Sequence, residues 1–255
     1  MVKKMNFFFL LILLFSFSYA KADEIVFVGD LWPPFNAEPL SEDEGYLIDI
    51  VREIFEGEGH TVKYSVRPWT RAIMEVKAGT FNALLGPFKS EAPGFIFPKE
   101  EIGASTLSFY TKADSTWIFN GIDSLKEVRL GVIQDYNYRP WLQEYRTSHP
   151  ENFVVMPGEK AIETNIKMLL NGRIDVIPTN MNSFLYRAKT GGYLDKIRFA
   201  GRDNIGESQK IYIAFSPNHN SSNKYADILS TGLIEMRASG RLQQILAKYG
   251  LIDWK

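Results

Sequence analysis

The chain has 255 residues, and 29 Lys+Arg against 30 Asp+Glu give a formal charge of −1. With 45% hydrophobic residues it has ordinary globular composition, and the length suits one large domain or two modest ones. The near-neutral charge gives no reason to expect nucleic acid, whose binding proteins usually present a basic face. The absence of cysteine excludes disulfides, zinc–thiolate sites, cysteine nucleophiles and a lipid-modified N-terminal cysteine.

The first 22 residues have the layout of a secretory signal peptide. Lys3 and Lys4 form a basic start, residues 7–17 are almost purely apolar, and Ala20-Lys21-Ala22 is an A-x-A cleavage pattern. A membrane anchor is the alternative, but the apolar run is about 11–14 residues long, whereas a spanning helix needs about 20. We therefore expect residues 1–22 to be cleaved and the protein to be exported to the periplasm.

Strand and helix patterns alternate over the first hundred residues. Short apolar runs of the kind found in buried strands are separated by stretches with apolar residues at helical spacing. The expected strands are 25–28, 62–66 and 83–85, and the expected helices are 46–55 and 70–77. This alternation predicts an α/β domain with a largely parallel sheet.

The same alternation returns after about residue 112. We expect strands at 128–132, 153–155, 174–177 and 211–215, and helices at 138–145, 161–170, 183–188, 223–236 and 241–249. One local pattern occurs twice: a helix end and a glycine precede Asn82 and Asp175, and an apolar strand follows each of them. Glycine after a helix is common, so this repeat is weak by itself. We interpret Asp175 as structural.

These elements predict two similar lobes joined by a two-strand hinge, with a ligand cleft between them. Residues 23–111 and 209–255 would form the first, discontinuous lobe, and residues 112–208 would be inserted as the second. The chain would then cross between the lobes near 109–112 and 207–211. Paired crossings of this kind allow hinge closure around a ligand.

Several motifs in order carry a resemblance to a known family. They are Trp32-Pro33-Pro34-Phe35, residues 45–50, Pro68-Trp69, residues 77–79, Leu125-Lys126, residues 170–175, residues 236–242 and residues 248–250. Each motif is unspecific, but their order and spacing match throughout. The chain resembles the periplasmic solute-binding proteins of ABC transporters, family 3, which includes the polar amino-acid binders. The resemblance implies a type II periplasmic-binding-protein fold that closes on a small-molecule ligand, with an ABC permease or a membrane sensor as partner.

The end of the first strand and the family pattern together indicate candidate ligand contacts, most of them aromatic. Asp30, Trp32 and Phe35 follow the carboxyl end of the first strand, where ligands bind in open α/β sheets. Trp32 and Trp69 match the family positions whose aromatic rings flank the ligand, and such rings can stack on a planar solute or hold a cation. A core or rim position is the alternative for either tryptophan. We interpret Phe35 as structural.

The charged residues that hold an amino acid in this family are absent at the matching positions. The resemblance implies an arginine for the α-carboxylate within residues 86–94, but that segment contains Phe88 and Lys89 instead. The ammonium-binding aspartate falls at Asn180, after Thr179, and a neutral amide cannot supply its charge. We therefore expect a small polar or anionic solute that is amino-acid-like but not a standard α-amino acid.

Other polar residues are further candidates. Arg71, one turn into the second expected helix, and Lys89 could replace the missing arginine, although both could equally be solvated surface cations. Gln134, Tyr136 and Tyr138 follow a strand of the second lobe, where tyrosine hydroxyls suit a half-apolar, half-wet site. For Tyr138 in particular, a helix surface is the competing interpretation.

No catalytic motif is present. The three histidines are scattered, and the sequence contains no HExxH, GxSxG or glycine-rich phosphate loop. We expect binding rather than catalysis, with no cofactor and no metal. The leading hypothesis is a monomeric periplasmic protein that delivers its solute to an ABC permease. The alternatives are a sensing module for a membrane signalling protein and, third, a periplasmic dehydratase-like enzyme.

Overall fold

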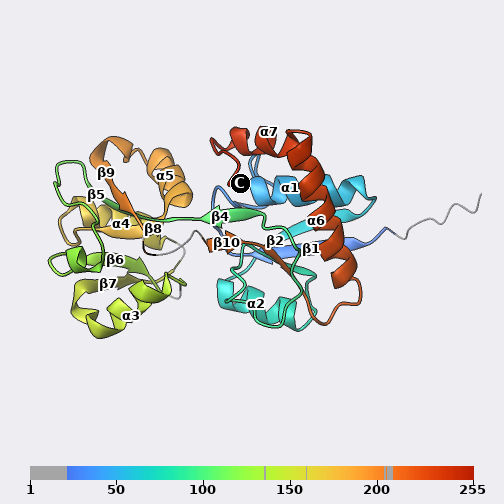
Figure 1. The fold of residues 1–255 in the computed structure, drawn as a ribbon, viewed down its shortest axis with the longest axis horizontal. Coiled ribbons are helices and arrows are strands. Elements are labelled where there is room, and N and C mark those ends of the chain that lie inside the picture. The colour runs from blue at the N-terminus through green and yellow to red at the C-terminus, as the bar shows by residue number, and fades with distance from the viewer. Residues whose placement is uncertain (1–21, 135, 159, 204, 206–208) are drawn as a thin grey trace, which may run out of the picture.

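A computed structural model describes residues 22–134, 136–158, 160–203, 205 and 209–255. The chain forms two lobes that are joined by a pair of strands (Figure 1). The expected signal peptide lies outside the described residues except for Ala22. None of the helices in the described part of the chain is both long and apolar enough to cross a bilayer.

The first lobe contains a four-stranded sheet in the order β11-β3-β1-β2. β1 is parallel to β2 and β3, and β11 is antiparallel to β3, as expected for a largely parallel sheet. The strands are β1 (Glu24–Gly29), β2 (Thr61–Val66), β3 (Ala83–Leu85) and β11 (Ile213–Phe215). The helices are α1 (Tyr46–Gly57), α2 (Trp69–Lys77), α6 (Ser222–Ala238) and α7 (Arg241–Lys248).

The core of the first lobe is formed by aromatic rings between the sheet and its helices. Phe27 of β1, Phe55 of α1 and Phe215 of β11 are fully buried. Their ring centroids lie 5.6 Å (Phe27–Phe55) and 6.2 Å (Phe55–Phe215) apart, and Tyr225 of α6 closes the cluster. Complete burial of side chains of this size stabilises a fold by about 1.5–3 kcal/mol each, so this cluster holds α1 and α6 against the sheet.

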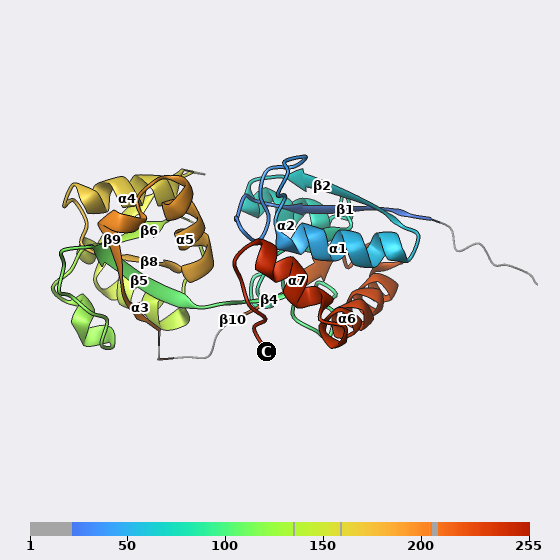
Figure 2. The same ribbon diagram turned by 90° about the horizontal axis from the view of Figure 1, so that it is seen from above.

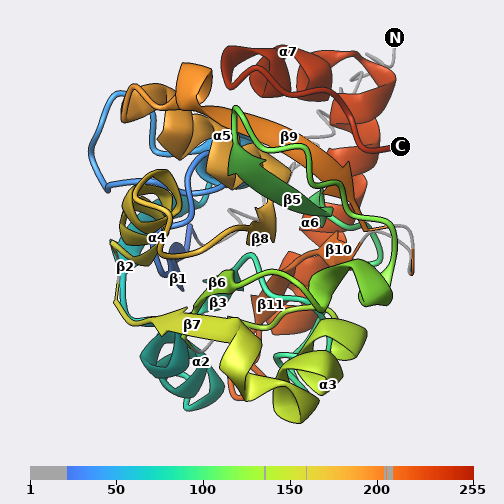
Figure 3. The same ribbon diagram turned by 90° about the vertical axis from the view of Figure 1, so that its left-hand side faces the viewer.

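The second lobe is built on a mixed set of strands (Figure 3). β5 (Leu107–Lys112) lies between β8 (Ile177–Asn180) and β9 (Ile197–Arg202) and is antiparallel to both. β6 (Leu130–Ile133) is parallel to β7 (Phe153–Met156), and a parallel bridge joins Leu130 to Val176. The remaining elements are α3 (Pro140–Ser148), α4 (Ala161–Leu170), α5 (Met181–Thr190) and the 3₁₀ turns η1 (Ile122–Leu125), η2 (Pro150–Asn152) and η3 (Leu194–Lys196).

The two lobes repeat one arrangement of strands. β7, β6, β8 and β5 of the second lobe follow the parallel, parallel, antiparallel pairing of β2, β1, β3 and β11. The repeated turn also has the same role in both lobes. Asn82 Oδ1 accepts a hydrogen bond from the Val26 N–H at 2.8 Å, and Asp175 Oδ2 accepts one from the Arg129 N–H at 2.9 Å. Each side chain thus anchors the neighbouring strand, which agrees with the structural interpretation of Asp175.

The connection between the lobes differs from the expectation on one side. β4 (Gly103–Ser105) and β10 (Gln209–Ile211) form an antiparallel pair at the crossing, which Figure 2 shows between the lobes. A two-strand hinge is therefore present, but its first strand precedes the expected crossing at 109–112. β5 belongs to the second lobe because it pairs with β8 and β9. The expected boundary at residue 111 is therefore wrong, and the first lobe ends near residue 106 instead.

Smaller differences affect two of the expected strands. β8 begins at Ile177, after most of the expected 174–177 strand. The expected 211–215 strand is divided between β10 and β11 at Tyr212, whose N–H donates to Pro87 O at 3.1 Å and whose carbonyl accepts from the Gly86 N–H at 3.0 Å. These local bonds turn the chain from the hinge into the first-lobe sheet.

Candidate ligand-binding cleft

A cavity lies between the lobes and is bounded by both of them and by the hinge. The first lobe supplies Asp30, Trp32, Trp69, Gly86, Phe88 and Glu91. The hinge strands supply Ser105 and Gln209. The second lobe supplies Leu107, Tyr136, Asn137, Tyr138, Arg139, Ile162, Thr179 and Asn180. Most of the residues that the sequence suggested therefore meet here, namely Asp30, Trp32, Trp69, Phe88, Tyr136, Tyr138, Thr179 and Asn180.

Three nominated residues lie outside the cavity lining. Arg71 Nε is 2.7 Å from Glu75 Oε1, one helical turn along α2, and its side chain is 63% exposed. Lys89 Nζ lies 4.6 Å from the centroid of the Tyr212 ring. Gln134 is exposed and extends β6, since its N–H donates to Met156 O at 2.8 Å. Both cations thus have local partners, and neither lines the cavity.

Trp32 is held in place by Phe35 and Gly86. The Trp32 and Phe35 rings stack at 4.0 Å with 14° between their planes, and Phe35 is fully buried. Gly86 has φ +81°, and a Cβ there would lie 3.4 Å from the Trp32 ring. Phe35 is therefore a structural support for Trp32, as the sequence indicated, and the glycine lets the chain turn beside the ring.

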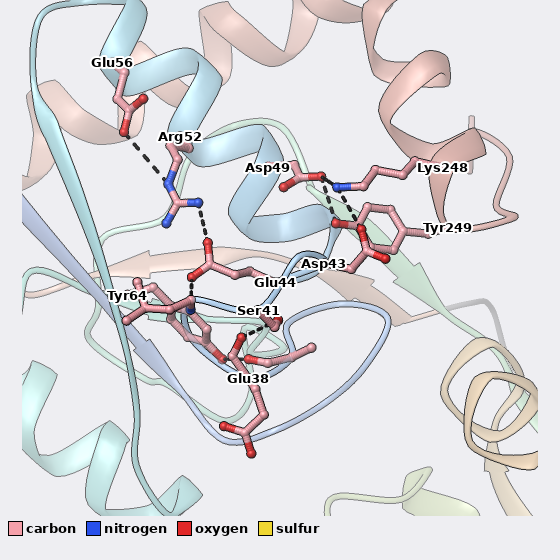
Figure 4. A network of polar contacts seen from close by, with 12 residues as sticks. Glu38, Ser41, Asp43, Glu44, Asp49, Arg52, Glu56, Tyr64, Lys248 and Tyr249 are labelled. Carbon is pink, nitrogen blue, oxygen red and sulfur yellow. Dashed lines mark hydrogen bonds and ion pairs between the residues drawn. The ribbon is translucent and has the colours of Figure 1, made fainter. Parts of the chain in front are cut away.

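A polar network fixes the segment that leads from Trp32 to α1 (Figure 4). Glu44 accepts a hydrogen bond from the Leu40 N–H at 2.7 Å and forms an ion pair with Arg52 of α1. Tyr64 Oη of β2 donates to Ala37 O at 2.8 Å. This loop is thereby tied to a helix and a strand of the first lobe, which limits the movement of the aromatic wall.

Glu91 is a second carboxylate, with Asp30, in the first-lobe wall of the cavity. Its Oε2 accepts a hydrogen bond from the Phe88 N–H at 2.9 Å. Burial, and to a smaller extent the negative charge of Asp30, raises the pKa of Glu91 to about 7, although the hydrogen bonds from Phe88 and Asn137 oppose this rise. Glu91 therefore titrates near neutral pH.

Polar contacts cross directly from one lobe to the other. Glu91 of the first lobe meets the Asn137 side chain of the second. Arg187 of α5 pairs with Glu163 of α4 and also reaches the carbonyl oxygen of Leu31, 3.5 Å from its Nη2. The lobes thus make contacts with each other in addition to those at the hinge.

Arg139 brings a guanidinium to the second-lobe wall, but its charge is already paired. Arg139 Nε lies 2.9 Å from Asp203 Oδ2, and the two side chains are 8% and 0% exposed. The carboxylate also accepts hydrogen bonds from Trp141 Nε1 at 3.3 Å and from the Ile205 N–H at 2.8 Å. The two charges are therefore buried as an ion pair, although Arg139 Nε makes no hydrogen bond within the described residues.

Asn180 has a structural role at the position where the family has its aspartate. Its Oδ1 accepts from the Ser183 N–H at 3.0 Å and caps α5, which is a preferred use of asparagine. Its Nδ2 donates to Ser105 Oγ of the hinge strand β4 at 2.9 Å. Because both ends of the amide are engaged, Asn180 links the second lobe to the hinge while it lines the cavity.

Sequence reasoning missed Glu91, Asn137 and Arg139. Glu91 lies in the 86–94 segment, where the family pattern points to an arginine and gives no signal for an acid. A usable signal preceded α3: proline favours the first position of a helix, so Pro140 marks its start and leaves Arg139 at the cap. The expected helix began at residue 138 instead, which placed Tyr138 and Arg139 within it; Tyr138 is in fact buried.

Comparisons with known proteins agree with this geometry at the level of the fold. No protein-family model and no curated protein matches the sequence. A histidine kinase sensor domain with similarity to periplasmic binding proteins matches with a TM-score of 0.71 at 20% identity, over 90% of this chain and 98% of its own. The chain has a periplasmic-binding-protein fold. This confirms the fold class that the sequence predicted.

Binding proteins of ABC transporters share the same fold. A structure from work on glutathione import through GshT and the cystine importer TcyBC of Streptococcus mutans matches with a TM-score of 0.73 at 18% identity, over 89% of this chain and 95% of its own. The probable amino-acid ABC transporter binding protein ytmK of Bacillus subtilis matches with a TM-score of 0.69 at 18% identity, over 90% and 98%. At these identities the likeness extends to the fold and not to a ligand.

Proposed function

We propose that the protein captures a small polar solute between its lobes and delivers it to the permease of an ABC transporter. The observation that carries this proposal is a cavity bounded by both lobes and both hinge strands. A solute that contacts both walls at once binds the closed arrangement better than the open one, and closure changes the surface that a permease meets. The fold shared with amino-acid-binding proteins of ABC transporters supports this function.

The walls of the cavity suit a solute with both apolar and polar parts. Trp32, Trp69 and Phe88 would bury its apolar surface against the first lobe. Tyr136 and Thr179 would supply hydroxyl groups from the second lobe, and Asp30 and Asn180 would complete the polar contacts. These residues are the proposed ligand contacts.

The proposal is tested with the purified monomeric chain lacking residues 1–22. At least one small polar solute in a broad metabolite panel should raise the melting temperature, because a ligand that binds only the folded protein stabilises it. The same solute should reduce the radius of gyration in X-ray scattering. If no solute stabilises protein that has been shown free of carried-over ligand, the proposed function is wrong.

Trp69 provides the sharpest single-residue test of this site. Trp69→Ala should weaken binding of the stabilising solute by about tenfold or more, because aromatic anchors dominate binding energy. The melting temperature of the ligand-free protein should change far less. Trp254→Ala is the matched control, since Trp254 packs against the first-lobe core but does not line the cavity. Titration calorimetry measures both affinities, and normal binding by Trp69→Ala would remove Trp69 from the site.

Export to the periplasm is the part of the proposal that concerns residues 1–22. N-terminal sequencing of the protein recovered from the periplasmic fraction should begin at Asp23. Recovery of the intact N-terminus in the membrane fraction would instead indicate an anchor.

A second candidate function is ligand sensing for a membrane signalling protein. The fold shared with a histidine kinase sensor domain favours it. Genes for a permease and an ATPase beside this gene would support transport, and a sensor gene would support signalling. Uptake of the labelled solute by cells that lack the gene measures the same distinction directly. Turnover of any stabilising solute by the purified protein would point instead to the third alternative, an enzyme.

A further inference from the structure

The charged groups around the cavity are predominantly acidic. Among the described residues that line it, the charged ones are Asp30, Glu91 and Arg139. Arg139 is paired with the buried carboxylate of Asp203 within the second lobe. Three carboxylates are thus set against a single guanidinium, so the site carries a net negative charge when all four groups are ionised.

The cations that would suit an anionic solute are held elsewhere. Arg71 pairs with Glu75 along α2, and Lys89 lies over the Tyr212 ring. Arg187, whose charge acts on Tyr136 of the cavity wall, is paired with Glu163. The solute would meet Arg139, but Asp203 already neutralises that guanidinium. An anion would therefore lie against Asp30 and Glu91 without a compensating cation among the described lining residues, which is electrostatically unfavourable.

The two first-lobe carboxylates act on the same space. Burial and then the negative charge of Asp30 raise the pKa of Tyr136 across the cavity, although the positive charge of Arg187 opposes this rise. The charge of Asp30 also contributes to the raised pKa of Glu91. The electrostatic field of Asp30 therefore reaches both walls. A positive charge between these groups would relieve the repulsion between the carboxylates, and each carboxylate oxygen can accept charge-assisted hydrogen bonds.

Aromatic rings line the same cavity as these carboxylates. Trp32 is fixed by its stacking on Phe35, and Trp69 begins α2 on the same wall. Tyr136 lies on the opposite wall. Aromatic faces attract cations through the ring quadrupole, most strongly where water is excluded. Carboxylates and aromatic faces together form a site suited to an organic cation.

We propose that the solute is a small organic cation, a protonated amine or guanidine, held by Asp30 and Glu91 among these aromatic rings. This proposal rests on the proposed function and specifies its ligand. Because Arg139 already has its counterion, the site requires no α-carboxylate on the ligand. This separates the proposed ligand from the anionic solute that the sequence also allowed and from a standard α-amino acid.

Solutes matched in shape and different in charge test the proposal. Butane-1,4-diamine, butane-1,4-diol and butanedioate share a four-carbon chain and are cationic, neutral and anionic. Agmatine and arginine share a guanidinium and differ by the α-carboxylate. We would add both sets to a panel with equal numbers of cationic, neutral and anionic metabolites, and measure thermal shift and calorimetric affinity at pH 8, where Glu91 is ionised.

The charge of the solutes that bind decides the outcome. Cations should be the stabilising class, and each should bind at least about tenfold more tightly than its neutral or anionic counterpart, as expected for loss of a charged hydrogen-bonding partner. Agmatine should bind at least as well as arginine if either binds. Preferential binding of anionic or neutral solutes would overturn the cationic ligand but keep the proposed function. Failure of every solute would overturn the proposed function itself, which is a different result.

Substitution of each carboxylate then tests whether Asp30 and Glu91 hold the cation. Glu91→Gln and Asp30→Asn should each weaken binding of the best cation by at least about tenfold, whereas Glu58→Gln, on the exposed end of α1, should not. Glu91→Gln removes a repelling charge, so the ligand-free variant should melt at or above the wild-type temperature, and lost binding cannot then be ascribed to misfolding. Wild-type affinity in both cavity variants would overturn the proposal.

Discussion

The two lobes share an order of strands but present different chemistry to the cavity. The first lobe offers the carboxylates of Asp30 and Glu91 beside tryptophan rings. The second offers hydroxyl and amide groups, and its one guanidinium among the described lining residues, Arg139, is neutralised by Asp203. The shared strands place loops at the same edge of each sheet. The residues on those loops, rather than the strands, decide which lobe selects the charge of a ligand.

The repeated turn also differs between the lobes, because its side chain is buried in the first lobe and partly exposed in the second. Asn82 in the first lobe is 8% exposed, whereas the Asp175 side chain in the second is 41% exposed. Both accept a hydrogen bond from the backbone of a neighbouring strand. One structural role is therefore filled by a neutral amide where water is scarce and by a carboxylate where water and Arg129 can solvate it.

The largest change in stability should come from removing the counterion of the buried Asp203 carboxylate in the second lobe. Arg139→Ala leaves the Asp203 carboxylate buried without its counterion, which should lower the free energy of unfolding by about 3 kcal/mol. Arg129→Ala removes an exposed ion pair with Asp175 and is the control, expected to have little effect. Urea denaturation measures both. Equal losses in the two variants would contradict the view that Arg139 and Asp203 form a buried unit.

The next largest change in stability should differ between the two copies of the repeated turn. Asn82→Ala leaves the partly buried Val26 N–H without its acceptor and should cost about 1–2 kcal/mol in urea denaturation. Asp175→Ala should cost less, because water reaches the Arg129 N–H. The exchanges Asn82→Asp and Asp175→Asn keep an acceptor oxygen in place and serve as controls. A larger loss for Asp175→Ala than for Asn82→Ala would show that burial does not govern this pair.

A further effect should appear as a pH dependence of stability that originates in the first lobe. The pKa of Glu91 is raised from 4.5 to about 7 in the folded protein, so the folded state holds the proton more tightly than the unfolded state. This contribution to stability is fully present below pH 4.5 and is lost as the pH rises through about 7.

The measurement compares melting temperatures of ligand-free wild type and Glu91→Gln across that range. The two proteins should melt alike near pH 4.5, and the variant should be the more stable one at pH 8, whereas Glu58→Gln should follow the wild type throughout. The groups that act on Glu91 are the Phe88 N–H, the Asp30 carboxylate and the Asn137 side chain, and Arg139 lines the same cavity. Parallel curves for wild type and Glu91→Gln would show that Glu91 does not titrate in this range.

The smallest effects are expected at the first-lobe cations that lie outside the cavity. Arg71→Ala and Lys89→Ala should leave the affinity for the stabilising solute within about twofold of the wild-type value, because neither residue lines the cavity. Calorimetry with the same solute makes the measurement, and Trp69→Ala is the positive control. A loss of affinity comparable to that of Trp69→Ala would restore either cation to the binding site.

The periodic parts of the chain were predictable because one local pattern determines each of them. The stripe of apolar residues in α1 and the short buried runs of β1 and β3 have an order and spacing that admit few folds. β5 was mistaken for a connection because nothing in a short apolar strand reveals which sheet it will join. That choice depends on β8 and β9, which lie far along the chain.

The sequence by itself determined the two-lobed α/β fold and the crossing of the chain near residue 209. It also indicated the aromatic residues after β1 as candidate ligand contacts. Hydrophobic periodicity and family motifs are local in the chain, and these features follow from them. Only the tertiary structure decided that Arg71 and Lys89 lie outside the cavity lining, that Glu91 and Asp30 line the same cavity, and that Asp203 pairs with Arg139. Those outcomes depend on charges brought together from distant segments, because electrostatic energy varies with separation and burial in space rather than with position in the chain.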